Sequence, residues 1–362
     1  MTSSPDIHSY RVAIVGEFSP PHAGMAVQAE LLVDRLPDFG ISVTRIVTNH
    51  YFLGHLTFLN RIKYLRGLFR LVTFLGQCRR IRKVDIVHIF SSSGINFYIF
   101  TIVPILLAKL FRKITIINYH GGNAREFFRT RKYLLNFAIK NSTSLVVPSG
   151  FLLDVFSGYG HHSLIIPNVI NTDRFVFRVR ECFNPNIIVC RNFTKLYNVA
   201  CAIKSFSIVQ ALYPDASLTL AGDGPERDAL TNLVESLKLN NVTFLGNVSN
   251  KRMNDIYNNA DIFLNTSNVD NMPNSVLEAF ACGLPVVSTN PGGIPYMVRH
   301  GETGFLAPIN DHEALANYIR TIIENNEMAG RMVASAVKEL DSYTWNSVGN
   351  LWLEHYQAIL VR

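Results

Sequence analysis

Short apolar runs alternate along the chain with longer stretches of helical periodicity. This pattern is typical of parallel sheets that helices cover on both faces. In the first half we expect strands at residues 12–15, 43–47, 86–89, 114–118, 145–147 and 165–166. In the second half we expect strands at residues 187–190, 217–221, 242–245, 262–265 and 286–288. The pattern therefore predicts an α/β protein with two doubly wound, Rossmann-like parallel sheets.

A turn-rich stretch, PNVINTD at residues 167–173, separates the two sets of strands. A chain of 362 residues is long for one core and suits two domains of about 150–200 residues each. We therefore expect a first domain over residues 1–170 and a second over residues 171–344. The amphipathic pattern that begins at Trp345 predicts a final helix within the remaining segment, 345–362.

Composition agrees with this organisation and adds an asymmetry of charge. Hydrophobic residues make up 48% of the chain and charged residues 17%, which suits a large buried core. Lys and Arg outnumber Asp and Glu by 20 to 9 in residues 1–175, against 14 to 18 in residues 176–362, so the halves carry +11 and −4. A half that basic is expected to be attracted to a polyanion or an anionic membrane surface. No recognition motif accompanies the charge, so we expect no nucleic-acid partner.

Cysteine usage and hydropathy predict a cytoplasmic protein. Five scattered cysteines without a CxxC pair indicate free thiols in a reducing compartment. We expect no signal peptide, because Arg11 leads directly into a strand-like run. The apolar run at residues 95–111 contains Asn96, Pro104 and Lys109 and is shorter than the ~18 residues of a membrane span, so it predicts a buried helix.

The most informative stretch is residues 266–308, TSNVDNMPNSVLEAFACGLPVVSTNPGGIPYMVRHGETGFLAP. Asp270 lies in a loop, and Glu278 follows eight positions later, near the start of a predicted helix. Pro273 suits the first turn of that helix, and Gly283 suits a left-handed cap at its end. Glu278 is therefore expected on the side where backbone N–H groups lack helical partners.

A second helix start is expected downstream of the next strand. There a Gly292-Gly293 turn precedes Ile294 and Pro295. Two helix N-termini with carboxylates beside them suit a ligand that carries both a phosphate and hydroxyl groups.

This segment resembles the donor-binding signature of the retaining glycosyltransferases of family 4, which have the GT-B fold. The family pattern places two Glu residues around a seven-residue spacer, with a Gly-Phe-Pro-like turn after the first and a Gly-Gly-Ile-Pro turn downstream. Here Asp270 stands at the first position, Asn271-Met272-Pro273 at the turn, and Glu278 at the second position. The resemblance implies transfer of a sugar from a UDP- or GDP-linked donor, with retention at the anomeric carbon and no further cofactor.

The resemblance assigns roles to the two carboxylates. Glu278 would accept hydrogen bonds from the donor ribose, or it is only an acidic residue favoured near a helix start. Asp270 would face the transferred sugar and stabilise positive charge at the anomeric carbon, unless it only opens an Asx-type turn. Backbone N–H groups of Asn271, Met272 and the residues that follow Pro273, which are Asn274, Ser275 and Val276, would supply further sugar and phosphate contacts. Pro273 has no N–H and is assigned to the donor site as part of the same loop.

The resemblance also makes Arg191, directly after the strand at 187–190, the group that binds the donor diphosphate. A planar, permanently charged fork suits that task. The family lysine that normally follows is replaced, so either Lys195 reaches the diphosphate from a shifted position or Tyr197 donates a hydrogen bond. Gly222, at the end of the strand at 217–221, is assigned to the donor site as well.

Two further candidates lie in the first half. Gly24 matches one glycine of the family's Gly-Gly turn, and Ala23 replaces the other. His120 matches the family's His-Gly pair near the reacting sugar and is expected to hydrogen bond to a sugar hydroxyl; the alternative is a structural histidine that caps a helix. The implied first domain binds the acceptor, the second binds the donor, and the final helix crosses back to the first domain.

Retention without a second nucleophile implies front-face substitution, in which the leaving phosphate takes the acceptor's proton. The chain has no Asp-x-Asp motif, which argues against a metal-bound diphosphate. The acceptor is expected to be a saccharide or a lipid-linked saccharide. Residues 55–83 carry eight Arg or Lys among Leu, Phe, Ile and Tyr, so they are either a helix that lies on the inner face of the cell membrane or an ordinary helix with a basic face.

A dinucleotide-dependent oxidoreductase would need a GxGxxG turn and an acidic ribose ligand, and the chain lacks both. A catalytically silent GT-B subunit that binds or scaffolds remains an alternative, because Asp270, the missing lysine and Ala23 depart from the family pattern.

Overall fold

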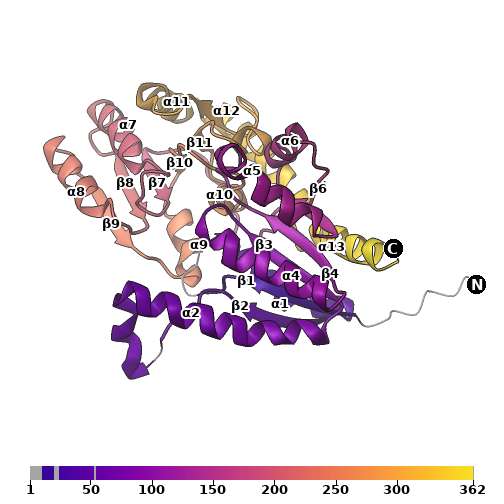
Figure 1. Cartoon of the computed structure of the whole chain (residues 1–362). Coiled ribbons are helices and arrows are strands. Elements are labelled where there is room, and N and C mark those ends of the chain that lie inside the picture. Colours follow the sequence, from indigo (N-terminus) through magenta and orange to yellow (C-terminus); the bar gives the residue numbers. More distant parts are fainter. Residues whose placement is uncertain (1–9, 20–23, 53, 362) are drawn as a thin grey trace, which may run out of the picture. The chain divides into compact units, whose positions relative to one another are not determined.

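The computed structural model describes residues 10–19, 24–52 and 54–361, and it divides the chain into two compact units. The first comprises residues 1–167 and 348–362, and the second comprises residues 168–347. Figure 1 shows both units with their elements labelled. Each is built on a parallel sheet of six strands, which confirms the predicted α/β class with two doubly wound sheets.

The sheet of the first unit has the strand order β2-β1-β3-β4-β5-β6. Its strands are β1 (Arg11–Gly16), β2 (Ser42–Val47), β3 (Ile86–Ser91), β4 (Ile114–Tyr119), β5 (Ser144–Val147) and β6 (Leu164–Ile165). Its α-helices are α1 (Gly24–Arg35), α2 (Lys63–Cys78), α3 (Ile95–Phe97), α4 (Val103–Leu110), α5 (Ala124–Lys140), α6 (Gly150–Gly158) and the greater part of α13 (Trp345–Leu360). Four shorter helical segments are η1 (Leu36–Phe39), η2 (Gly54–Arg61), η3 (Arg79–Lys83) and the π-helical η4 (Tyr98–Ile102).

The sheet of the second unit has the order β12-β11-β10-β7-β8-β9. Its strands are β7 (Asn186–Cys190), β8 (Ser217–Ala221), β9 (Val242–Gly246), β10 (Ile262–Asn265), β11 (Val286–Thr289) and β12 (Phe305–Ala307). Its α-helices are α7 (Val199–Leu212), α8 (Arg227–Ser236), α9 (Asn250–Asn258), α10 (Asn274–Ala281), α11 (His312–Glu324) and α12 (Asn326–Glu339). Its short 3-10 helices are η5 (Thr172–Arg174), η6 (Ile294–Tyr296) and η7 (Leu340–Tyr343).

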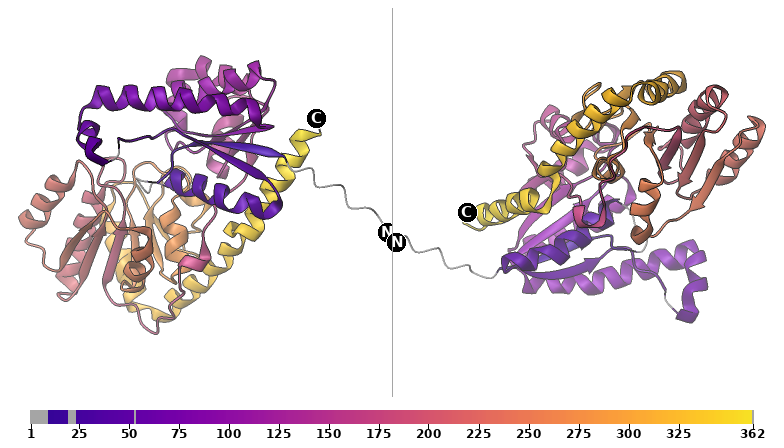
Figure 2. Two further views of the ribbon diagram at one scale, coloured as in Figure 1. Left: turned by 90° about the horizontal axis from the view of Figure 1, so that it is seen from below. Right: turned by 180° about the vertical axis from the view of Figure 1, so that it is seen from behind.

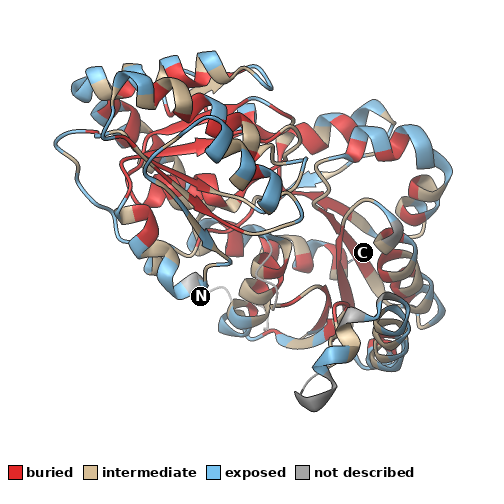
Figure 3. Ribbon diagram, turned by 90° about the vertical axis from the view of Figure 1, so that its left-hand side faces the viewer, coloured by how far each residue is buried: buried red, intermediate tan, exposed pale blue. Residues whose placement is uncertain are grey.

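The inner strands of both sheets are largely buried, as the red arrows of Figure 3 show. Every residue of β3, β10 and β11 is buried. Strands buried on both faces read as continuous apolar runs, which is why the sequence pattern located them. β12 was not predicted, because its three residues between Gly304 and Pro308 give too short a run.

The expected helix at residues 95–111 is present as α3, η4 and α4 in succession. Phe97, Ile105 and Ala108 are buried in the core of the first unit. Across the described part of the chain, no helix combines the length and the apolar character that a membrane crossing requires.

α13 is joined to the first unit through His88 at the centre of β3. The imidazole is fully buried; Asn118 donates its Nδ2 proton to Nε2 (3.1 Å), so the proton on Nδ1 is donated to the hydroxyl of Tyr356 (2.7 Å). The Trp352 ring lies 4.5 Å from the imidazole. Burial lowers the pKa of His88 well below its usual value, so the ring is neutral. Figure 2 shows α13 in yellow beside this unit.

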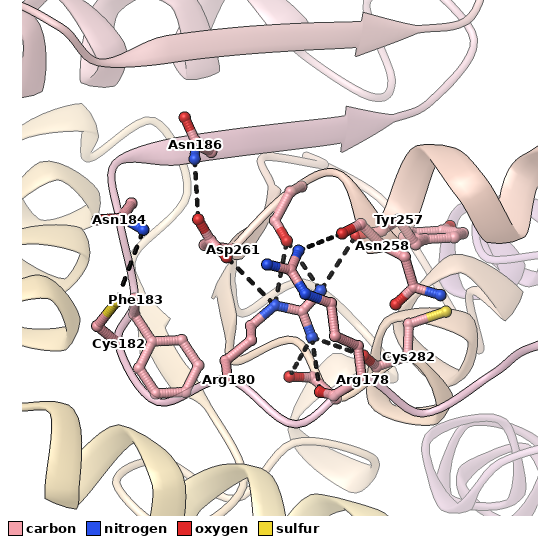
Figure 4. A network of polar contacts seen from close by, with 12 residues as sticks. Arg178, Arg180, Cys182, Phe183, Asn184, Asn186, Tyr257, Asn258, Asp261 and Cys282 are labelled. Atoms are coloured by element: carbon pink, nitrogen blue, oxygen red, sulfur yellow. Dashed lines mark hydrogen bonds and ion pairs between the residues drawn. The ribbon is translucent and has the colours of Figure 1, made fainter.

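In the second unit, Arg180 ties together the ends of α9 and α10 (Figure 4). Its guanidinium donates to the carbonyls of Ala260 (2.8 Å), Cys282 (2.7 Å) and Gly283 (3.1 Å). Its Nε lies 3.3 Å from the carboxylate of Asp261, and the two side chains are only 1% and 4% exposed. Helix C-termini carry unpaired carbonyls and partial negative charge, which a buried cation satisfies.

We expect Arg180→Met to lower the free energy of unfolding by about 3–5 kcal/mol, because it leaves the Asp261 carboxylate buried without its cation. Urea unfolding followed by circular dichroism measures the change. The matched control is Arg299→Ala, whose ion pairs with Glu302 and Glu339 are about half exposed and should contribute about 0–1 kcal/mol. Equal stability of the two variants would contradict this role of Arg180.

Candidate functional site

The candidate residues of the second unit follow the carboxyl ends of neighbouring strands. Arg191 follows β7, Gly222 follows β8, and the loop that contains Asp270 follows β10. β7 pairs in parallel with both β8 and β10, so the strand ends meet at one edge of the sheet. Open parallel sheets bind their ligands at this edge.

Arg191 and Asp270 form an ion pair at the centre of this edge. The Nη2 of Arg191 donates to Oδ2 of Asp270 at 2.8 Å, and its Nε donates to Oδ1 of Asn265 at 2.9 Å. The side chains of Arg191 and Asp270 are 10% and 12% exposed. The Tyr197 ring lies 5.2 Å from the guanidinium carbon. Arg191 is thus held in one orientation.

A buried polar network fixes Asn265 in turn. Its Oδ1 also accepts a hydrogen bond from the hydroxyl of Ser267 (2.8 Å), and its Nδ2 donates to the hydroxyl of Ser288 (2.9 Å). The hydroxyl of Thr289 donates to the carbonyl of Ser267 (2.7 Å). Asn265, Ser267, Ser288 and Thr289 all have 0% exposure. Arg191 therefore rests on a rigid, neutral acceptor.

The Asp270 carboxylate also contacts the backbone of its own loop. Its Oδ1 accepts from the N–H of the next residue, Asn271 (3.0 Å). The Asp270 carbonyl accepts from the N–H of Gly293 (3.2 Å), and a Cβ at Gly293 would lie 2.0 Å from the Asn271 carbonyl oxygen. Only glycine allows this approach. With both oxygens engaged and Arg191 adjacent, much of the charge of Asp270 is compensated within the protein.

Gly222 allows the loop after β7 to approach β8 closely. Its φ is +154°, and a Cβ there would lie 1.9 Å from the carbonyl oxygen of Arg191. The Arg191 N–H donates to the carbonyl of Ala221 (3.1 Å). Gly222 therefore acts on the site by placing the backbone of Arg191.

Glu278 lies in the second turn of the eight-residue α10 and accepts a hydrogen bond from the Tyr257 hydroxyl (2.8 Å). Burial raises the pKa of Glu278, while that hydrogen bond and the positive charges of Arg174 and Arg191 oppose the rise. Glu278 and Arg191 are thus electrostatically coupled. Nearby, burial raises the pKa of the Cys190 thiol to about 12, so this cysteine stays protonated.

The start of α10 differs from the prediction in two respects. Pro273 is the N-cap residue instead of part of the first turn, and Glu278 is the fifth residue of α10, in its second turn. The N–H groups of Asn271 and Val276, which we expected to bind the donor, donate to Asp270 and to the carbonyl of Pro273 (3.1 Å).

Side chains around the start of α10 are also occupied, with one exception. Asn168 donates from its Nδ2 to the carbonyl of Met272 (3.0 Å) and to the amide oxygen of Asn274 (3.1 Å). The Ser275 hydroxyl is buried and has no hydrogen-bond partner among the described residues. The second expected helix start is the three-residue η6, which is too short to supply a helix dipole. Of the two helix starts expected in residues 266–308, only that of α10 belongs to a helix of more than one turn.

The two alternatives for the missing lysine occupy different places. Lys195 is exposed, whereas the Tyr197 ring packs against the guanidinium of Arg191. In the buried environment of Tyr197, its pKa is raised. The tyrosine therefore lies with the other site residues.

His120 and Gly24 belong to the first unit. His120 follows β4 and stacks on Phe90, with ring centroids 5.2 Å apart. Burial lowers the pKa of His120 to about 4, and its Nε2 is buried without a hydrogen-bond partner in the described part of the chain. His120 caps no helix, since α5 begins after Asn123. Gly24 is the first residue of α1; Ala23 lies outside the described residues.

Two residues of this site were not predicted from the sequence. The sequence did hint at Asn265, because a polar amide at the end of an otherwise apolar, buried strand must find hydrogen-bond partners. Tyr257 gave none, because an aromatic residue in a helix usually belongs to the core. Within the described ranges, no group of three or more His, Cys, Asp or Glu is placed to hold a metal ion.

Comparison with known proteins finds a family model that matches the second unit. The sequence model of the glycosyl transferases group 1 matches residues 181–339, which include Arg191, Asp270 and Glu278. Over these residues the chain resembles the glycosyl transferases group 1. It is 32% identical over 147 residues to N-acetyl-alpha-D-glucosaminyl L-malate synthase of Bacillus anthracis, a match that spans 40% of this chain and 38% of that relative.

A longer match, at 25% identity over 310 residues, is to alpha-monoglucosyldiacylglycerol synthase of Acholeplasma laidlawii; it covers 76% of each chain. Among solved structures, sucrose-phosphate synthase of Thermosynechococcus elongatus superposes with a TM-score of 0.79 at 18% identity, over 97% of this chain and 99% of that one. Anabaena HepE in complex with UDP-glucose superposes with a TM-score of 0.74 at 17% identity, over 96% and 100%. These likenesses confirm the GT-B fold.

The raised pKa of Glu278 predicts a stability gain when its charge is removed. Above this pKa the folded chain holds a buried carboxylate, whereas the unfolded chain hydrates it, so Glu278 lowers stability at neutral pH. Between the raised pKa and the ordinary value of 4.5, this penalty disappears as the pH falls. We expect Glu278→Gln to raise the melting temperature at pH 7.5 by about 2–4 °C, and the gain should vanish near pH 4.

Thermal unfolding across this pH range measures the effect. The matched control is Glu235→Gln on the exposed side of α8, for which we expect no pH-dependent difference from wild type. A Glu278→Gln variant that is less stable than wild type at pH 7.5 would contradict the assignment.

Proposed function

We propose that this protein is a retaining glycosyltransferase that moves a sugar from a UDP- or GDP-linked donor to a saccharide or lipid-linked saccharide. The observation that carries the proposal is the shared environment of Arg191 and Glu278 at the carboxyl edge of the second sheet. A guanidinium for a diphosphate and a carboxylate for ribose hydroxyls are the groups that a nucleotide sugar requires.

The first turn of α10 supplies the second element of an anion site. A helix N-terminus carries partial positive charge, and the buried hydroxyl of Ser275 is available to a ligand oxygen. In the proposed reaction the donor diphosphate leaves toward Arg191 and α10, and their positive charge stabilises it. The same leaving oxygen takes the acceptor's proton, so no protein base is required for a front-face transfer.

His120 fits a binding role in this scheme. With a pKa of about 4 its imidazole is neutral at pH 7 and is a poor proton acceptor for catalysis. A neutral ring with an unpartnered Nε2 is instead suited to a hydrogen bond with a sugar hydroxyl. The proposed donor class agrees with the UDP-glucose bound by Anabaena HepE.

The acceptor side of the proposal involves α2 and its flanks. The exposed apolar side chains of α2 recur every three or four residues and therefore share one helical face; they are Leu65, Leu68, Val72 and Leu75. Phe58 in η2 and Ile62 at the start of α2 are exposed as well. Residues 55–83 contain eight Arg or Lys and no Asp or Glu. An apolar face flanked only by positive charge fits an anionic membrane surface.

A membrane location suits a lipid-linked acceptor. The name of the Acholeplasma synthase specifies a glucosyldiacylglycerol, and the chain resembles that protein over most of its length. We propose that the enzyme acts in the cytoplasm, on the inner face of the cell membrane. The face of α2 that opposes the exposed row holds Phe74 and Cys78 in the core of the first unit.

Donor binding tests the first part of the proposal. We expect wild-type protein to bind UDP or GDP and to transfer or hydrolyse one of the corresponding sugars in a panel of donors. Arg191→Ala should weaken binding of the diphosphate about 10- to 100-fold, because charge-assisted hydrogen bonds are lost. Isothermal titration calorimetry measures this, with Arg299→Ala as the control. Binding without turnover of any donor would favour the silent binding subunit, and no binding would contradict the proposal.

Flotation with lipid vesicles tests the membrane surface. We expect wild-type protein to float at low salt with vesicles that contain 30% phosphatidylglycerol and not with pure phosphatidylcholine. Leu68→Gln together with Val72→Gln should reduce the bound fraction about tenfold or more, because two apolar side chains no longer enter the lipid. The matched control is Leu212→Gln, an exposed leucine of α7 in the second unit. Failure of the wild type to float would remove this part of the proposal.

A further inference from the structure

The two neighbouring N–H groups with which the Arg191 guanidinium would bind a phosphate already donate hydrogen bonds to side chains of the protein. A guanidinium binds an oxyanion bidentately through two neighbouring N–H groups, such as those on Nε and Nη2. Here Nε donates to Asn265 (2.9 Å) and Nη2 donates to Asp270 (2.8 Å). That whole edge of the fork is therefore occupied by the protein.

We propose that Asp270 competes with the nucleotide diphosphate for Arg191, which weakens the hold on the product and speeds its release. This inference rests on the proposed function. It gives Asp270 a task other than facing the transferred sugar. When the diphosphate binds, Nη2 exchanges the Asp270 carboxylate for a phosphate oxygen; when the product leaves, the ion pair forms again.

The two acceptors differ in the way that such an exchange requires. Asn265 is neutral, has 0% exposure and is fixed by hydrogen bonds with Ser267 and Ser288. Asp270 is anionic and lies in a loop, where its other oxygen accepts a hydrogen bond from the next residue, Asn271. An incoming diphosphate repels Asp270 and leaves Asn265 undisturbed. Asn265 thus keeps the guanidinium in place while Nη2 changes partner.

The pair is sheltered enough for its loss to matter. The side chains of Arg191 and Asp270 are 10% and 12% exposed, so water screens their attraction less than it screens a surface pair. A diphosphate that binds Arg191 must break the ion pair with Asp270. The free energy of that ion pair is lost, so the affinity for both substrate and product is lower. In many enzymes product release limits turnover, and a lower affinity for the leaving nucleotide then raises kcat.

Calorimetry with wild type and Asp270→Asn tests the competition. The probes are UDP and GDP, inorganic pyrophosphate, and the nucleosides uridine and guanosine. We expect Asp270→Asn to bind the nucleoside diphosphate and pyrophosphate about tenfold tighter, the gain of one charge-assisted contact. Nucleoside affinity should stay unchanged. Asp270→Ser, whose shorter side chain does not reach Nη2, should show the same change, and it serves if the first variant does not fold.

The control variant is Asp215→Asn, which removes the same charge from an exposed loop before β8, at the opposite edge of the sheet. We expect it to bind the diphosphates as wild type does. Product inhibition of the transfer reaction by the nucleoside diphosphate should become about tenfold stronger in Asp270→Asn, with a lower kcat.

The outcomes separate this inference from the function on which it rests. If wild type binds no nucleoside diphosphate, the proposed function is wrong. If wild type binds one and the Asp270 variants bind it equally or more weakly, the competition is wrong while the function stands. A change of the same size in nucleoside affinity would likewise overturn the competition, because Asp270 would then shape the whole site.

Discussion

The orientation of one guanidinium determines what the second unit can bind. Arg191 is fixed by a neutral amide on β10, an anionic side chain in the following loop and the ring of Tyr197. Two buried hydroxyl groups, of Ser288 on β11 and of Ser267 in the loop after β10, hold that amide. Gly222 has no side chain, which leaves room for the backbone of Arg191. The close backbone approach at Gly222, the buried hydrogen bonds of Asn265 and the ion pair with Asp270 all fix the position of the Arg191 guanidinium.

The fold follows from constraints that are local in sequence. Parallel strands covered on both faces must be apolar throughout, and this was enough to locate every strand except β12. Cap chemistry was also readable: Gly283 has the left-handed φ of +71° that was expected after α10. The start of α10 was misjudged by one residue at Pro273, because a proline suits both the cap and the first turn.

The site was predictable in its membership and much less so in its contacts. The position of Arg191 after β7 follows from chain order, whereas its partner Asp270 lies 79 residues away and depends on how two loops close. Hydrogen bonds within the loop cannot be deduced from residue types, so the sequence did not show that the N–H groups of Asn271 and Val276 have acceptors within the protein. The hydrogen bond from the Tyr257 hydroxyl to Glu278 could not be predicted from residue types either.

The account depends most directly on a single ligand reaching both Arg191 and Glu278. A crystal structure of the protein with a bound UDP- or GDP-sugar measures this. The account predicts a phosphate oxygen within hydrogen-bond distance of the Arg191 guanidinium, the diphosphate at the start of α10, and ribose hydroxyls at the Glu278 carboxylate. A nucleotide bound without contact to either side chain, or a diphosphate directed away from Arg191, would contradict it.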